Sequence, residues 1–240
     1  MAINPHLTAV LQAGVTYYRI TSPQFHTSSP THHRRVVNGQ GAARNPVGSR
    51  YAHGLVPTVY LANDLETCLA ERMFYFHREV LPQLDQAHIT GFLPPFQLPS
   101  VLWEMEFKDD VTDLADLTRF ANAFGIFPAL MLNPSQDYLH LKEARARIQG
   151  AGYAGLVAPS ARSAAGGMMT VIFGDQSKNV AVIRPHPMQS RLICTGSPTK
   201  PFANHVTDSL DFTAGEVFFP HSPTISGIKR SGWFRVKFNH

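Results

Sequence analysis

Three residues capable of chemistry lie at short intervals in "GSRYAHGLVPTVYLANDLETCLAE", residues 48–71. Arg50 follows a glycine turn, Tyr60 follows it in a β-branched stretch, and Glu71 comes after a helix start. A guanidinium is a planar fork that suits bidentate phosphate binding. A carboxylate can stabilise developing positive charge or orient an attacking group. The ordinary alternative is a loop, a strand and a helix that carry surface residues without a special role.

The charges of the first quarter of the chain favour an anionic partner. The net charge is +4, the first acidic residue is Asp64, and the bases before it are Arg19, Arg34, Arg35, Arg44 and Arg50. A surface without carboxylates suits a phosphate-bearing ligand, a nucleic acid or an acidic protein. Chance, with the arginines simply solvated, explains the same pattern.

Several other chemistries lack their signatures. The chain has no P-loop, GxGxxG or HExxH pattern, and Ser160 in "APSAR" lies outside a GxSxG elbow. Adjacent His32 and His33 in a polar loop are expected to face solvent, so we predict no metal site. Cys68 and Cys194 make no disulfide framework, and Cys68 is predicted to be a small buried hydrophobe.

Nothing in the sequence predicts a membrane segment. No run of eighteen apolar residues occurs, and the N-terminus lacks the basic and apolar regions of a secretory signal. We therefore expect no contact with a membrane and a cytoplasmic site of action.

The elements that must position Arg50, Tyr60 and Glu71 can be predicted from local patterns. Residues 58–62 are expected to form a strand, after which Asn63 serves as an N-cap with Glu66 completing a capping box. One helical stripe, apolar apart from Arg72, comprises Leu65, Cys68, Leu69, Arg72 and Phe76. Glu71 lies on its flank, where a side chain can reach the rim of a cleft.

The remaining pattern predicts an α+β fold. Residues 16–21 read as a strand and residues 22–49 as a loop. Further expected elements are two strands around a proline-rich turn at 88–107, a helix at 135–149, a strand after Tyr153, strands at 168–173 and 178–185, and strands in "GEVFFP" and "SGWFRVKFNH". Strands mixed with a few helices, without a βαβ rhythm, indicate α+β.

Four motifs in order make the chain resemble the RES domain family, which is named for Arg, Glu and Ser. They read "GSRYAHG", "TVYLA", "CLAE" and "APSAR". The resemblance covers roughly residues 15–186, so we expect a catalytic domain over 1–186 and a strand- and loop-rich extension over 187–240 that packs on the same domain. Two departures are noted: Ala52 replaces the family's Asn, and "MTVIFGD" replaces its usual last strand motif.

The resemblance implies a toxin that degrades NAD on an ADP-ribosyltransferase-like fold with a split sheet. It also implies a helix-turn-helix antitoxin or an immunity protein as partner, with nucleic acid met only through the antitoxin. NAD is then the substrate, and no other cofactor is expected.

The roles implied for individual residues follow from cleavage of the nicotinamide–ribose bond, which develops positive charge at the ribose C1′. Glu71 would stabilise that charge, Arg50 would hold phosphate or ribose, and Tyr60 would stack on nicotinamide or bind the ribose. Ser160 would position Arg50 or the nicotinamide amide, and Arg19 would make a second phosphate contact. Arg44 and Arg162 are further candidates.

Two other functions stay open. An ADP-ribosyltransferase shares the chemistry, although such enzymes often carry Glu or Gln two residues before the catalytic Glu, where this chain has Leu69. A non-enzymatic module that binds nucleic acid or a partner protein would explain the basic first quarter. Whether water, phosphate or a macromolecule accepts ADP-ribose is not decided by the sequence, nor is a homo-oligomer, nor whether the toxin is chromosomal or a delivered effector.

Overall fold

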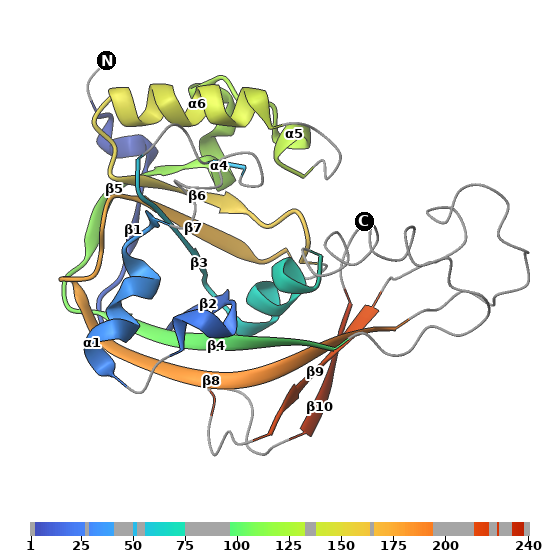
Figure 1. Cartoon of the computed structure of the whole chain (residues 1–240). Coiled ribbons are helices and arrows are strands. Elements are labelled where there is room, and N and C mark those ends of the chain that lie inside the picture. The colour runs from blue at the N-terminus through green and yellow to red at the C-terminus, as the bar shows by residue number, and fades with distance from the viewer. Residues whose placement is uncertain are drawn as a thin grey trace, which may run out of the picture.

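Ten strands form one sheet in the order β1-β5-β6-β7-β3-β2-β4-β8-β9-β10 (Figure 1). The computed structural model describes residues 3–26, 29–40, 50–51, 56–74, 97–132, 138–163, 166–193, 214–220, 225 and 232–237. The strands are β1 (Thr8–Leu11), β2 (Tyr17–Thr21), β3 (Thr58–Ala62), β4 (Gln97–Phe107), β5 (Val111–Asp116), β6 (Gly155–Pro159), β7 (Met168–Phe173), β8 (Val180–Ile193), β9 (Ala214–Phe219) and β10 (Gly232–Lys237). The predicted α+β class is confirmed.

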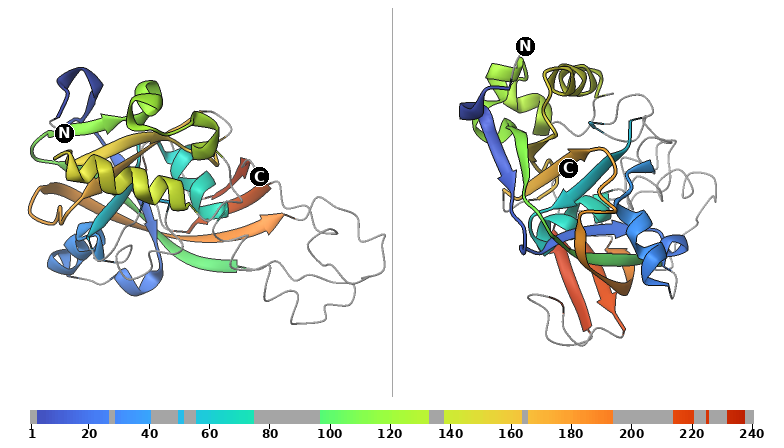
Figure 2. Two further views of the ribbon diagram at one scale, coloured as in Figure 1. Left: turned by 90° about the horizontal axis from the view of Figure 1, so that it is seen from above. Right: turned by 90° about the vertical axis from the view of Figure 1, so that its left-hand side faces the viewer.

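Most helices in the described part of the chain are short. They are η1 (Pro5–Leu7), η2 (Pro23–Phe25), α1 (Pro30–His33), η3 (Arg34–Val37), α4 (Leu117–Phe120), η4 (Ala121–Phe124), α5 (Pro128–Leu132) and α6 (Leu139–Gly150). The described residues 65–74 are also helical. Helices α4, α5 and α6 lie over the face of β6 and β7 in both views (Figures 1 and 2). The chain's layers are therefore helix on sheet at one end and a curved sheet at the other.

The sheet divides between β2 and β3. These strands share the single pair Tyr18↔Ala62, whereas β3 pairs with β7 and β2 with β4 over five residues each. Beyond that pair, Arg19 Nη1 donates to the backbone carbonyl of Tyr60 at 3.0 Å. A side chain thus takes the place of a ladder bond where the strands separate, and the predicted split sheet is confirmed.

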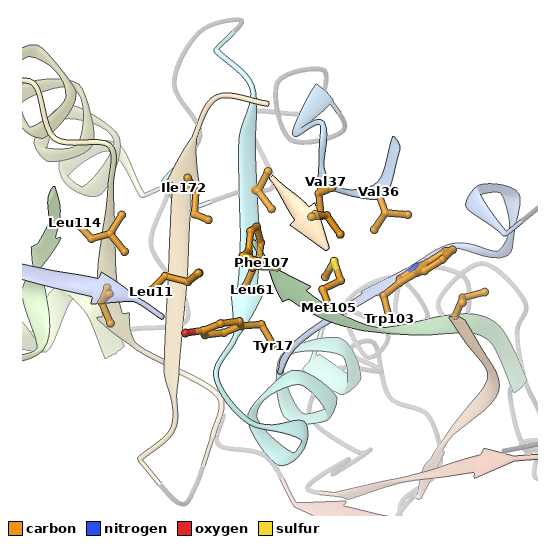
Figure 3. Close-up of a cluster of buried hydrophobic side chains, with 14 residues drawn as sticks. Leu11, Tyr17, Val36, Val37, Leu61, Trp103, Met105, Phe107, Leu114 and Ile172 are labelled. Carbon is orange, nitrogen blue, oxygen red and sulfur yellow. The ribbon is translucent and has the colours of Figure 1, made fainter. Parts of the chain in front are cut away.

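The alternation along β3 assigns its side chains to two faces. Val59 and Leu61 are fully buried in one cluster, and Thr58, Tyr60 and Ala62 face the other side. Figure 3 shows Leu61 in that first cluster with the side chains of β4 beside it. Each such aliphatic side chain contributes about 1.5–3 kcal/mol by burial. Tyr60 is thereby fixed on the opposite face, where it packs against the two remaining clusters.

The helix over 65–74 begins one residue later than predicted. Asp64, not Asn63, is its cap, because Asp64 Oδ1 accepts from the Thr67 N–H at 2.7 Å and Thr67 Oγ1 donates to Asp64 Oδ2 at 2.8 Å. Asn63 Oδ1 instead accepts from Thr170 Oγ1 of β7 at 2.9 Å. The predicted box of Asn63 with Glu66 is therefore wrong. Because the Asn63 side chain bonds to β7, it does not cap the helix.

Two further expectations need correction. The expected loop over 22–49 contains η2, α1 and η3, because Pro23 and Pro30 start helical turns and Val36 and Val37 bury against the sheet. Its residues 41–49 lie outside the described part. The helix expected from 135 begins at Leu139, with 133–137 outside the description. Residues 88–96, the first of the two strands expected at 88–107, also lie outside it.

Strand β8 is longer than the strand expected at 178–185. It runs through Pro185 and Pro187 because β9 pairs with β8 only from Gln189 onward, so both prolines sit where one side of the strand needs no partner. The predicted boundary at 186 lies within this strand. The division of the chain at that residue stays a prediction, although β9 and β10 confirm that the C-terminal part carries strands.

Candidate active site

Glu71 lies on the flank of the helix over 65–74, as predicted. Cys68, Leu69 and Met73 of the same helix are buried in the cluster that packs against β4 and β8–β10. The side chain of Glu71 keeps 12% of its surface exposed. The helix is thus anchored by its apolar face, and the carboxylate is held at the boundary of the core.

Two groups from distant segments meet at one oxygen of this carboxylate. Arg50 Nη2 donates to Glu71 Oε1 at 2.6 Å, and Ser160 Oγ donates to the same oxygen at 2.7 Å. Among the described residues, no hydrogen bond falls on Oε2. The arrangement orients the carboxylate through one of its two oxygens.

Arg50 is held by a second contact on its other nitrogen. Nη1 donates to the backbone carbonyl of Met131, at the end of α5, at 3.1 Å. The residue is 7% exposed, so its charge is largely removed from water. A buried guanidinium that bonds a carboxylate is a strong, directional contact. Arg50 therefore joins α5 to the helix of Glu71.

The serine turn after β6 fixes the direction of the Ser160 hydroxyl. Ser160 Oγ accepts from the N–H groups of Arg162 and Ser163, each at 3.1 Å. With both acceptor positions used, its proton points to Glu71. Ser160 N–H donates to the Gly167 carbonyl at 2.8 Å, and a side chain at Gly167 would collide with Thr67 of the Glu71 helix. Glycine at 167 lets the serine turn approach that helix.

Tyr60 is tied to the residue that follows Arg50. Its phenol oxygen accepts from the Tyr51 N–H at 2.9 Å, and its backbone carbonyl accepts from Arg19. The strand of Tyr60 thus fixes the turn that carries Arg50. Arg50, Tyr60, Glu71 and Ser160 are brought together as predicted, through these bonds.

Arg19 lies apart from the Arg50–Glu71 pair, at the opening between β2 and β3. Burial lowers the pKa of its guanidinium, and Cys68 and Tyr60 partly oppose that shift. Its guanidinium bonds to the main chain of β3, at the carbonyl of Tyr60. The phosphate contact expected of Arg19 stays a prediction, and Arg44 lies outside the described residues.

Neutral groups complete the surroundings of Glu71. Burial raises the pKa of Tyr51 to about 12, with Arg50 opposing and Glu71 adding to the shift. Burial also raises the pKa of the Cys68 thiol, which is free, so that residue behaves as the small buried hydrophobe that the sequence predicts. Neither side chain carries charge near neutral pH.

Sequence reasoning missed three parts of the site. The Met131 carbonyl has no signal in the sequence, because any residue supplies the same group. Phe74 lies one helical turn after Glu71, and its ring carries the guanidinium of Arg162, whose carbon is 3.2 Å from the ring centroid. Tyr51 is not among the residues that the sequence predicted for the site. The spacing of Phe74 from Glu71 could have pointed to the same helix face.

The described residues offer little for other ligands. They contain no group of three or more His, Cys, Asp or Glu side chains suited to a metal ion, and no helix among them is long and apolar enough to cross a membrane. His33 is buried, not exposed as expected, because its ring packs edge-on against Trp103 at 5.1 Å.

Comparison with known proteins decides the family. The RES domain model matches residues 16–200. The chain belongs to the RES domain family. A chain in the crystal structure of the M. tuberculosis MbcT–MbcA toxin–antitoxin complex is similar at 20% identity and a TM-score of 0.46, over 71% of this chain and 83% of that one. No curated protein matches.

Proposed function

We propose that this RES domain protein degrades NAD by cleaving its nicotinamide–ribose bond. The observation that carries the proposal is the Glu71 carboxylate, which Arg50 and Ser160 hold by one oxygen with the other left unengaged among the described residues. That is the arrangement needed for a fixed anion beside a developing cation. Membership of the family supports the same substrate.

In the proposed step the bond between ribose C1′ and the pyridinium nitrogen breaks, and its electron pair neutralises the nicotinamide. Positive charge develops at C1′, where Glu71 Oε2 would stabilise it and bind the 2′-hydroxyl. Water then attacks C1′ and loses a proton, so that the products are nicotinamide, ADP-ribose and a proton. Because nicotinamide leaves as a neutral molecule, no strong general acid is needed.

Other residues would bind the dinucleotide. Arg50 would exchange its contact with Glu71 or Met131 for a phosphate or ribose oxygen, and Tyr60 would lie against nicotinamide or the ribose. Arg19 would add a phosphate contact if substrate reaches the opening between β2 and β3. Phosphate in place of water as the acceptor would give ADP-ribose 1″-phosphate through the same site.

The biological role proposed is that of a toxin. Loss of NAD in the cytoplasm would arrest growth, and an antitoxin or immunity protein would prevent it, with nucleic acid bound only through that partner. The solved complex that resembles this chain is described as a toxin–antitoxin complex. Family membership, not that likeness, supports the role.

ADP-ribosyl transfer is the second candidate, and one feature disfavours it. Position 69, where transferases often have a second acidic or amide residue, holds Leu69, which is 4% exposed and packed in the core. A polar residue there would face apolar neighbours. The site therefore offers no side chain at that position to activate a macromolecular acceptor.

The deciding experiment mixes the purified protein with NAD alone and measures free nicotinamide. Catalytic release is expected for the wild type and a loss of about 10²–10³-fold for Glu71→Gln. Glu66→Gln is the matched control, because Glu66 lies exposed on the same helix. Label that appears only on an added protein or nucleic acid would indicate transfer, and the absence of nicotinamide release would overturn the proposal.

A further inference from the structure

A pocket lies outside the candidate active site, at the end of η4 and beside α5 and α6. Helices α5 and α6 belong to the layer that covers β6 and β7 (Figure 1). The pocket has a volume of about 160 Å³, and its walls are formed by Gly125, Ile126, Phe127, Leu130 and His140. A cavity of about 150 Å³ with apolar walls accommodates one benzene-sized ring. This pocket therefore has room for one apolar side chain.

Apolar side chains are exposed beside the pocket. Six large hydrophobic residues are exposed in the described part of the chain, and three of them are Phe127 just before α5, Leu132 at its end and Leu139 at the start of α6. Phe127 is 72% exposed. Ile126 and Met131 are buried in the core instead, so they anchor α5 and its other side chains face outward. Exposed apolar residues that gather in one region are typical of an interaction surface.

A cation borders the pocket. Arg147 is exposed on α6, and its Nη2 donates to the carbonyl of Phe124 at 3.5 Å. A methyl group added to Gly125 would lie 3.5 Å from the same nitrogen, so the guanidinium lies against the wall that Gly125 forms. His140, in the pocket wall, adds a ring N–H donor. The polar groups at the pocket therefore suit an acceptor that carries negative charge.

We propose that this region docks a polypeptide segment of a partner protein, which places an apolar side chain in the pocket and a carboxylate against Arg147. We call the region the α5 surface, and it comprises the pocket walls together with Leu132, Leu139 and Arg147. The inference goes beyond the proposed function, because none of these side chains is assigned a part in NAD cleavage.

The size of the pocket favours a polypeptide over a metabolite. Pockets for drug-sized ligands enclose about 300–1,000 Å³, whereas one side chain fills the space available here. The rest of a bound segment would then cover the exposed side chains of Phe127, Leu132 and Leu139. Protein interfaces commonly combine an anchor side chain in a pocket with surrounding contacts that exclude water.

Charge complementarity favours an acidic segment over a second copy of this chain. The pocket walls, as described, include no acidic side chain, and Arg147 lies at their edge. The chain itself carries a net charge of +4, so two copies repel each other over long range. A segment with Asp or Glu next to its anchor is attracted to the same surface.

Helix α5 connects this surface with the candidate active site. Leu130 lines the pocket, and the carbonyl of the next residue, Met131, accepts from Arg50 Nη1 at 3.1 Å. A partner bound to the α5 surface is therefore held beside the active site, on the helix that helps to fix Arg50.

The test selects binders to the full-length protein from a phage-displayed library of random 12-residue peptides. We expect the recovered peptides to share Phe, Leu or Met next to Asp or Glu. Fluorescence anisotropy of a labelled, recovered peptide then gives Kd for wild type and variants. Leu130→Trp, which fills the pocket, and Arg147→Glu, which reverses the charge at its edge, should each raise Kd at least about tenfold. The effect of Arg147→Glu should shrink at high salt.

Glu143→Gln is the matched control for Arg147→Glu, because Glu143 lies exposed on the same helix. Its Kd should stay equal to that of wild type or fall up to about threefold, since a negative charge is removed. Thermal unfolding identifies any variant that fails to fold. If Leu130→Trp fails, Phe127→Ala replaces it and should raise Kd about fivefold, because Phe127 is largely exposed and its loss leaves the core intact.

Four outcomes overturn the inference. The library may yield no binder, or peptides without an apolar residue next to an acidic one. The recovered peptides may bind the pocket variant or Arg147→Glu as tightly as wild type. A dimer in analytical ultracentrifugation that Leu130→Trp abolishes would assign the α5 surface to a second copy. None of these measurements uses NAD, so they decide the inference whether or not the protein releases nicotinamide.

Discussion

Among the described residues, two glutamates that are largely or fully shielded from solvent bond basic side chains in two different settings. Glu71 is held by groups from segments far apart in the chain, Arg50 and Ser160. Glu104 lies in the middle of β4, 2% exposed, with its Oε2 3.1 Å from His186 Nε2 of the neighbouring strand. Strands β4 and β8 pair along their whole shared length.

The contrast distinguishes a candidate active site from a buried contact that stabilises the sheet. A carboxylate inside a continuous ladder has neighbours that cannot move without breaking strand pairs, and Glu104 is shielded from solvent there. Glu71 lies on a helix flank, and its partners Arg50 and Ser160 come from turns. Functional side chains are often carried by turns and loops, where no strand pairing occupies the space in which they converge.

The largest expected effect tests this contrast directly by the same change at both sites. Glu71→Gln should remove about 10²–10³-fold of NAD cleavage, and Glu104→Gln should leave kcat/KM within about threefold. Glu104→Gln should instead lower the free energy of unfolding by about 1–3 kcal/mol, because a charge-assisted buried bond is weakened. Nicotinamide release and urea unfolding of each variant provide the measurements.

A loss of activity in Glu104→Gln without loss of stability would contradict the distinction between a candidate active site at Glu71 and a stabilising contact at Glu104. Ser177, partly exposed near the start of β8, offers a silent position for a control substitution, Ser177→Ala.

The second largest effect on activity is expected from Arg50→Lys. Lysine keeps the charge, but its single ammonium cannot span Glu71 and the Met131 carbonyl as two guanidinium nitrogens do. We expect kcat/KM for NAD to fall about 10- to 100-fold, which corresponds to the ~1.5–3 kcal/mol of one charge-assisted hydrogen bond. Steady-state kinetics measures the change. Arg119 has a largely exposed side chain, so Arg119→Lys should leave kcat/KM unchanged and serves as the control. An Arg50→Lys enzyme with wild-type kinetics would show that the two-nitrogen contact of the guanidinium is dispensable.

The sequence predicted the residues of the site better than the contacts that hold them. Glu71 on the helix flank and Tyr60 opposite Val59 follow from the periods of a helix and a strand, which are local properties. The cap at Asp64 was mispredicted because Asn63 bonds to Thr170, a partner 107 residues away. Long-range competition of this kind has no local signal.

The same limit applies to the fold. Hydrophobic patterns identified most of the strands but not β1 or β5, and the α+β class followed from the order of the elements. The helical turns within 22–49 were missed because polar residues and prolines suggest a loop, whereas the burial of Val36 and Val37 against the sheet decides the local structure. The Met131 carbonyl could not be predicted, since it depends on where α5 ends relative to Arg50.

A smaller effect is expected from Ser160→Ala. The change removes one hydrogen bond to Glu71 Oε1 while Arg50 still holds that oxygen. It also frees the N–H groups of Arg162 and Ser163, which loosens the turn. We expect kcat to drop about tenfold, with KM little changed, as one bond to a charged group is lost.

Ser163→Ala is the comparison for that variant, since Ser163 Oγ accepts from the Gly167 N–H in the same turn and does not donate to Glu71. If Ser163→Ala reduced kcat as much as Ser160→Ala, the effect would belong to the turn and not to the bond with the carboxylate.

The smallest effect concerns Tyr51, which sits between the site and the core. Its side chain is 1% exposed and packs with apolar residues, and its hydroxyl has no hydrogen-bond partner among the described residues. A buried polar group without a partner is destabilising by about 1–3 kcal/mol. Tyr51→Phe should therefore raise Tm by about 2–4 °C, as read by differential scanning fluorimetry. Because its N–H still binds Tyr60, kcat/KM should stay within about threefold. A fall in both Tm and activity would contradict this prediction. It would place the Tyr51 hydroxyl with the ligand-binding groups and not with the core.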